Sequence, residues 1–171
     1  MDAVAVEVVE VGLRDGLQNL DVVMATADKC RWIAAEHAAG VREIEVGSFV
    51  PPQLLPQMAD AAEVVAFART LPGLSVAALV PNRRGARDAI GAGVHKIGIP
   101  VSVSPAHSLA NVRKTPAEMI AEVANICRMR AEGPLQPKSK WDLQPPLGAP
   151  FRAPSRKTTW CAWRRPVWQP A

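Results

Sequence analysis

Three polar side chains, Arg14, Asp15 and Gln18, follow closely on an apolar run that extends from Val4 to Val11. An apolar run of this length predicts a buried strand. In α/β proteins with parallel strands, charged side chains placed directly after a strand build binding and catalytic sites. The spacing therefore predicts a functional site at this turn. The alternative is a surface turn that carries an exposed ion pair.

Polar side chains also follow three further predicted strands. These strands are the segments at residues 41–47, 74–80 and 94–99. Ser48 follows the first run and Asn82 the second, while His107 and Asn111 follow the third. The carboxyl ends of parallel strands share one edge of the sheet, and in a (β/α) barrel that edge is the catalytic face. We therefore expect these polar groups to lie on one edge.

The segments between the strands show helical spacing and helix-boundary residues. Thr26 is the predicted N-cap of the first helix, with Asp28 in its first turn, and Gly40 ends it. Thr115 and Glu118 predict a capping box for a helix that runs to about residue 132. The other predicted helices span 56–69 and 84–92, and residues 101–113 are a predicted loop. Four strands that alternate with helices predict a parallel sheet with right-handed crossovers.

The composition is that of a soluble globular domain, with 171 residues, 49% hydrophobic and 21% charged. No apolar run reaches the roughly 18 residues that a membrane span needs, and the N-terminus shows no signal peptide. The three cysteines are too far apart for CxxC spacing and favour a reducing compartment. These features predict a cytoplasmic protein with no membrane partner.

Residues 133–171 differ in composition from the rest of the chain. Residues 134–171 contain eight of the 16 prolines and four of the five tryptophans, and Asp142 is the one acidic residue among seven Lys and Arg. We predict a poorly ordered tail, because the prolines forbid a helix and no apolar period is present. Basic and aromatic residues together could bind single-stranded nucleic acid, but the charges lie on no regular face. We therefore expect no nucleic-acid partner.

Several motifs in the first 131 residues resemble the hydroxymethylglutaryl-CoA lyase family. The family belongs to the metal-dependent (β/α)8-barrel lyases and synthases that share an Arg-Asp-Gly loop. The matching segments are Arg14-Asp15-Gly16-Leu17-Gln18-Asn19, Ile44-Glu45-Val46-Gly47-Ser48-Phe49-Val50, Pro56-Gln57-Met58-Ala59-Asp60, Val80-Pro81-Asn82 and Ser108-Leu109-Ala110-Asn111. The resemblance implies an incomplete (β/α)8 TIM barrel, in which residues 1–132 supply the first four βα units. Residues 133–171 are expected to be an irregular tail without a counterpart in the family.

The resemblance also implies residue roles and a reaction. Arg14 would polarise the substrate carbonyl as a catalytic residue, and Asp15 would bind a divalent metal, Mg²⁺ or Mn²⁺. Glu45 would be a second catalytic residue, while Gln18, Ser48 and Asn111 would bind substrate or order the site. The reaction would be the metal-assisted retro-Claisen cleavage of 3-hydroxy-3-methylglutaryl-CoA to acetyl-CoA and acetoacetate, a step of leucine degradation and ketone-body metabolism. The partner would be an acyl-CoA substrate, and a family-like homodimer is an open alternative.

The sequence departs from the family in its metal ligands. The family also uses a His-x-His pair, a later Asn and a Cys in a glycine-rich loop, whereas the histidines here are His37, His95 and His107. A full barrel has about 250 residues. The alternative is therefore a catalytically inactive half-barrel fragment without the His-x-His ligands. A displaced reading frame at 148–156 can spell residues that resemble the bacterial members, so we hypothesise that the chain is out of frame from about 134.

Single residues also have plainer interpretations. Glu45 could be a buried carboxylate that only pairs with Arg14, and Ser48 could be an ordinary loop hydroxyl. His95 lies in a predicted strand and is expected to pack rather than to bind a metal. His37 is expected to be a cation near a helix end, and His107 stays open. Cys30 and Cys127 lie on predicted helices and are expected in the core.

Overall fold

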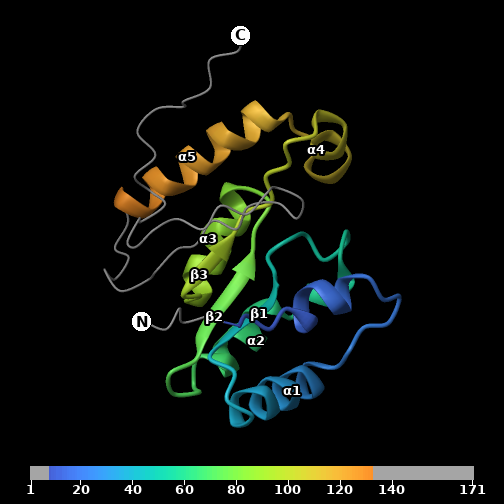
Figure 1. Ribbon diagram of the computed structural model, residues 1–171, viewed down its shortest axis with the longest axis vertical. Coiled ribbons are helices and arrows are strands. Elements are labelled where there is room, and N and C mark those ends of the chain that lie inside the picture. Colours follow the sequence, from blue (N-terminus) through green and yellow to red (C-terminus); the bar gives the residue numbers. More distant parts are fainter. Residues whose placement is uncertain (1–7, 133–171) are drawn as a thin grey trace, which may run out of the picture.

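Three parallel strands form the sheet of this computed structural model, which describes residues 8–132. The strands are β1 (Glu43–Ser48), β2 (Ser75–Leu79) and β3 (Lys96–Gly98), and their order in the sheet follows the order in the chain (Figure 1). The predicted α/β fold with parallel strands is therefore confirmed. The start of the first predicted strand and the tail of residues 133–171 lie outside the described residues.

The predicted first strand is represented by Glu10. Its backbone N–H donates to the Glu43 carbonyl at 3.0 Å, and its carbonyl accepts from the Glu45 N–H at 2.8 Å. Glu10 and Ile44 thereby form a parallel bridge, which is isolated from the named strands. The chain therefore runs alongside β1 at the point where the Arg14 turn begins.

Helices connect the strands and pack on one face of the sheet. Right-handed crossovers between adjacent parallel strands place successive helices on the same side. Helix α2 packs on β1 and contacts both α1 and α3, and α5 packs against α3 (Figure 1). The helical elements are η1 (Gly12–Gly16, a π-helix), α1 (Thr26–Ala38), η2 (Pro56–Met58, a 3₁₀-helix), α2 (Ala61–Ala68), α3 (Arg83–Ala92), α4 (Pro105–Val112) and α5 (Pro116–Glu132).

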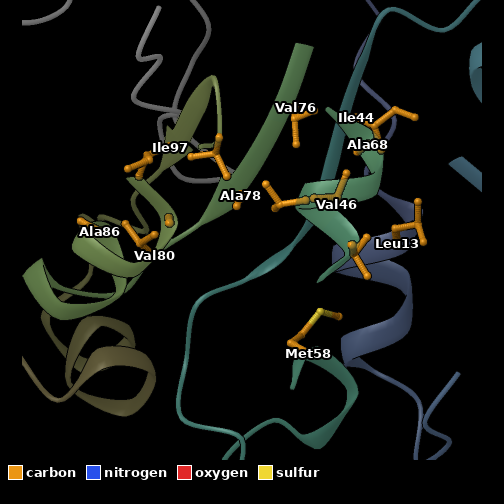
Figure 2. Close-up of a cluster of buried hydrophobic side chains, with 14 of the residues drawn as sticks. Leu13, Ile44, Val46, Met58, Ala68, Val76, Ala78, Val80, Ala86 and Ile97 are labelled. Carbon is orange, nitrogen blue, oxygen red and sulfur yellow. The ribbon is translucent and has the colours of Figure 1, made fainter. Parts of the chain in front are cut away.

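The hydrophobic core lies between the sheet and these helices. Figure 2 shows Ile44 and Val46 of β1 with Val76 and Ala78 of β2 in this layer, and all four are buried. Because side chains alternate along a strand, the residues between them belong to the opposite face. That face is also buried and carries charge, since Lys96 of β3 pairs there with Glu43 of β1, two strands away.

The helix-boundary predictions are partly confirmed. Thr115 and Glu118 form the predicted capping box: the Glu118 N–H donates to the threonine hydroxyl at 3.2 Å, and the Thr115 N–H donates to the carboxylate at 2.7 Å. The Thr26 cap is wrong, because Ala25 occupies the N-cap and Thr26 is the first helical residue. The Thr26 hydroxyl donates instead to the Asp60 carboxylate at 2.7 Å.

The predicted loop at 101–113 contains a helix, α4, so that prediction is wrong. Ser104 caps the helix and accepts from the His107 N–H at 3.3 Å, and Pro105 occupies the first position. A Ser-Pro pair is a helix-start signal, but eight residues are too few to show a clear apolar period. Arg113 ends the helix with a φ of 55°. Among residues 8–132, no helix has the length and apolarity to cross a membrane.

His95 gives the fold a pH-dependent contact. Its ring Nδ1 accepts a hydrogen bond from the Val76 N–H of β2 at 2.9 Å, so the ring completes the backbone pairing of that strand. Burial lowers the pKa of His95, and the nearby Arg69 guanidinium lowers it further. Only the neutral ring can accept this bond.

We predict that the free energy of unfolding decreases as pH falls through about 6.5, where His95 binds a proton more readily in the unfolded chain than in the folded one. Urea unfolding at pH 7.5 and 5.5 measures this loss. In His95→Asn the amide oxygen takes the place of Nδ1 but does not titrate, so the loss should be smaller. An equal loss in both proteins would contradict the role of His95.

Candidate active site

The turn after Glu10 needs a glycine at its first position. The Gly12 N–H donates to Glu10 Oε1 at 2.5 Å. A Cβ atom at Gly12 would lie 2.7 Å from that oxygen and 3.0 Å from the Trp32 ring of α1. The N–H groups of Arg14 and Asp15 then bond to the Val11 carbonyl at 3.0 and 2.7 Å. The π-helical turn thereby brings Arg14 to the end of β1.

Arg14 is fixed by the buried carboxylate of Glu45. Arg14 Nε and Nη2 both lie 2.7 Å from Glu45 Oε2, and the exposed fractions of the two side chains are 13% and 3%. Arg14 Nη1 donates to Asp15 Oδ1 at 2.8 Å. The guanidinium thus lies between a buried carboxylate and a half-exposed one. It has five N–H donors, and the remaining ones have no partner among residues 8–132.

Burial raises the pKa of Glu45, and the negative charge of Asp15 adds a small increase. The positive charge of Arg14 and its hydrogen bond act in the opposite direction. A charge-assisted pair in a dry environment is geometrically well defined, because neither partner has water as an alternative. Glu45 therefore orients the guanidinium, as the plainer interpretation of this residue predicted.

Asp15 is held in place by its own turn. Gln18 Nε2 donates to Asp15 Oδ1 at 3.1 Å, and Asn19 Nδ2 donates to the Asp15 carbonyl at 2.6 Å. Both side-chain bonds from Arg14 and Gln18 end on the same oxygen. No residue in the described part of the chain donates to Oδ2, so this half-exposed oxygen faces outward as an acceptor. The structure therefore brings together Arg14, Asp15, Gln18 and Glu45.

Ser48 reaches the face of Glu45 through a β-bulge. Glu45 pairs with Ala77 and Gly47 pairs with Ala78, so Val46 is an extra residue in β1. A Cβ atom at Gly47 would lie 3.4 Å from the Ala61 Cβ, which places Gly47 on the helix-covered face. Ser48, the next residue, therefore points to the opposite face, which is that of Glu45.

The hydroxyl of Ser48 is buried without a hydrogen-bond partner in the described part of the chain. The residue is 1% exposed, and no group among residues 8–132 bonds to its Oγ. A buried hydroxyl without a partner costs free energy, so it is a group that a bound ligand can satisfy. The substrate-binding role of Ser48 stays a prediction.

Asn111 is not brought to this group. It lies exposed on α4, and no hydrogen bond in the described part of the chain joins it to Arg14 or Asp15. His107 is exposed on the same helix, and its backbone N–H donates to the hydroxyl of Ser104, which caps the helix. Their proposed place at the strand edge therefore stays a prediction.

The predicted divalent metal does not find a complete site in residues 8–132. Within these residues, no group of three or more His, Cys, Asp or Glu side chains could hold a metal ion. Asp15 is the single predicted ligand present at the site, and a hard cation needs more oxygen ligands than one carboxylate offers. The described residues therefore do not fit a metal centre by themselves.

Two buried lysines were missed by the sequence analysis. Lys29 of α1 is 2% exposed and pairs with Asp60, and Lys96 of β3 pairs with Glu43. A lysine in an amphipathic helix or at a strand end is normally expected at the surface. The match to the Pro-Gln-Met-Ala-Asp segment contained the partner of Lys29 but gave no reason to look for a cation.

Comparison with known proteins places the chain in one family. A family profile described as HMGL-like matches residues 5–132. The chain is 47% identical over 107 residues to the 3-hydroxy-3-isohexenylglutaryl-CoA/hydroxymethylglutaryl-CoA lyase of Pseudomonas aeruginosa, covering 63% of this chain and 36% of that protein. It is 40% identical over 126 residues to the mitochondrial hydroxymethylglutaryl-CoA lyase of Gallus gallus, covering 72% and 42%.

Solved structures of lyases show the same arrangement of elements. The HMG-CoA lyase of Acinetobacter baumannii in complex with coenzyme A and 3-methylmalate matches with a TM-score of 0.73 and 31% identity, over 81% of this chain and 44% of that one. The Pseudomonas aeruginosa lyase matches with a TM-score of 0.73 and 36% identity, over 82% and 45%. The chain thus spans less than half the length of these relatives.

We predict that Arg14→Met destabilises the fold by roughly 3–5 kcal/mol, because it leaves the Glu45 carboxylate buried without its cation. The same change should raise the pKa of Glu45, which carbon-detected NMR titration of the side chain measures. Arg31→Met is the matched control, since Arg31 is exposed and pairs with Asp28. The double variant Arg14→Met/Glu45→Leu should recover part of the loss. A pKa of Glu45 that does not move would refute the proposed coupling.

Proposed function

The chain belongs to the HMGL-like family, and we propose that its site takes part in cleaving a carbon–carbon bond of an acyl-CoA. The proposed substrate is 3-hydroxy-3-methylglutaryl-CoA, and the proposed products are acetyl-CoA and acetoacetate. The observation that carries this proposal is the Arg14 guanidinium, which Glu45 fixes at the end of β1 with N–H groups still unpaired among residues 8–132. The named relatives that the chain resembles are lyases for this substrate.

The proposed reaction is a retro-Claisen cleavage. A base removes the proton from the 3-hydroxyl group, the bond between C2 and C3 breaks, and C3 becomes the ketone carbon of acetoacetate. The electron pair of the broken bond passes to C2 and forms the enolate of acetyl-CoA, which then takes up a proton at C2. The negative charge therefore develops on the thioester oxygen during bond breaking.

Arg14 is suited to stabilise that developing charge. A guanidinium donates hydrogen bonds to an oxyanion and keeps its own charge at any physiological pH. Because Glu45 and Asp15 hold it from two sides, it needs no reorganisation when the charge develops. Glu45 is the positioning partner in this proposal, since both of its short contacts to Arg14 end on one oxygen.

Ser48 and Gln18 are the proposed substrate-binding residues. The buried hydroxyl of Ser48 lies on the face of Glu45 and lacks a partner among residues 8–132, so it is available to a carbonyl or carboxylate of the substrate. Gln18 already donates to Asp15 and would order this carboxylate for ligand binding. A divalent Mg²⁺ or Mn²⁺ remains the proposed cofactor, with Asp15 as its ligand in this chain. The described residues do not complete such a site by themselves.

The second candidate is a protein without catalytic activity of its own. The observation that favours it is the incomplete metal site, since residues 8–132 contain no group of three or more His, Cys, Asp or Glu side chains that could hold a metal ion. In that case the Arg14 site would be retained from the family but would not turn over substrate. The two candidates differ in one measurable property, which is turnover.

We predict that the purified 171-residue chain produces acetoacetate from 3-hydroxy-3-methylglutaryl-CoA when Mg²⁺ or Mn²⁺ is added. A coupled assay that reduces acetoacetate measures the rate. Arg14→Gln should lower kcat by about a thousandfold, the typical effect of removing a donor to a developing oxyanion. Arg31→Gln is the control and should leave the rate unchanged.

Absence of turnover by the unsubstituted chain would favour the non-catalytic candidate. Turnover that survives Arg14→Gln would show that the reaction uses another group. If calorimetry shows that the substrate binds but the assay shows no turnover, the result would support the proposed binding site and contradict the proposed catalysis.

A further inference from the structure

Lys29 is the largest side chain that is fully buried in the described part of the chain. It lies in the first turns of α1, where its ammonium donates to Asp60 Oδ1 and to the Gln57 carbonyl, the latter at 2.6 Å. A buried ammonium is tolerated only when its hydrogen bonds are satisfied. The position of Lys29 therefore constrains the chain at residues 57–60.

Asp60 ties the same segment to α1 a second time. Its Oδ1 accepts from Lys29, and its Oδ2 accepts from the Thr26 hydroxyl at 2.7 Å. Asp60 is also the residue before α2, so the start of α2 is fixed relative to the start of α1. Both oxygens of this carboxylate are used for the connection between the two helices.

Gln57 extends the network to the turn of the candidate site. Its Nε2 donates to the Leu20 carbonyl, five residues after Asp15. The network therefore joins two loops. The first is residues 17–25, which continues from Arg14 and Asp15, and the second is residues 49–60, which continues from Ser48.

Apolar packing holds only part of these two loops. Leu17 and Met58 are buried in the core, whereas Leu20, Val22, Val23 and Leu54 are each more than half exposed. Segments with few buried apolar contacts open easily, unless hydrogen bonds restrain them. The polar network centred on Lys29 restrains the part of each loop that the core does not hold.

We propose that Lys29 is a positioning residue for the candidate site. It contacts none of Arg14, Asp15, Glu45 or Ser48, but it fixes the two loops that follow them relative to each other. This assigns a physical purpose to the Pro56-Gln57-Met58-Ala59-Asp60 segment, which the proposed reaction does not use. The inference rests on the proposed function only where substrate binding is concerned.

The test is amide hydrogen exchange in the full chain with Lys29→Met, which keeps the length of the side chain and removes its charge. Exchange at residues 17–25 and 49–60 should become about ten- to hundredfold faster, the effect expected when charge-assisted hydrogen bonds are lost. Exchange in β1, β2 and β3 should stay unchanged. Arg31→Met on the same helix is the matched control and should change neither region.

A second arm measures the binding of 3-hydroxy-3-methylglutaryl-CoA by calorimetry. Lys29→Met should weaken binding at least about tenfold under conditions in which circular dichroism shows that the variant is fully folded, an effect that a loss of global stability alone would not produce. If the unsubstituted chain does not bind this compound, the proposed function fails, and the exchange arm alone decides on Lys29.

Two results would overturn the proposal. One is exchange in the two loops that Lys29→Met leaves unchanged. The other is a uniform acceleration that includes the three strands, which would make Lys29 a residue of general stability. If Lys29→Met does not fold, the pair Lys29→Met/Asp60→Leu removes both charges and keeps the test open. Restored folding with fast loop exchange supports the proposal, and restored folding with slow loop exchange refutes it.

Discussion

The ion pair between Arg14 and Glu45 is the interaction on which the candidate site depends. A carboxylate with 3% exposure cannot remain ionised without a cation nearby, and the cation comes from a turn 31 residues earlier in the chain. This requirement explains why the Gly12–Gly16 turn is so tightly built. The turn follows the bridge between Glu10 and Ile44, and it must place the Arg14 guanidinium next to Glu45 of β1. The site is thus a product of strand pairing as well as of side-chain chemistry.

Much of this arrangement was predictable, because its signals are local. The segments that form β1, β2 and β3 lie between glycines and prolines, and the Thr115 capping box is visible within four residues. The closeness of Arg14 and Asp15 follows from adjacency. The pairing of Arg14 with Glu45 was one of the two interpretations that the sequence allowed for Glu45, and the structure shows this pair.

Features that depend on distant partners were not predictable in the same way. Thr26 has the residue type of an N-cap, but a carboxylate 34 residues later takes its hydroxyl. Lys29 looks like a surface residue, until Asp60 and the Gln57 carbonyl are placed around it. The short helix α4 has a clear start at Ser104, but its apolar pattern is too brief to outweigh a loop interpretation. In each case tertiary contacts overruled the local preference.

The bulge at Val46 has a consequence for how the gene can vary. Because side chains alternate along β1, the extra residue decides whether Ser48 shares the face of Glu45 or turns toward α2. Deleting one codon between these two residues would remove the bulge and place the serine two positions after Glu45, which is the same face in a regular strand. The bulge therefore accommodates one residue of additional length, and the two side chains would still share a face in a β1 strand that is one residue shorter.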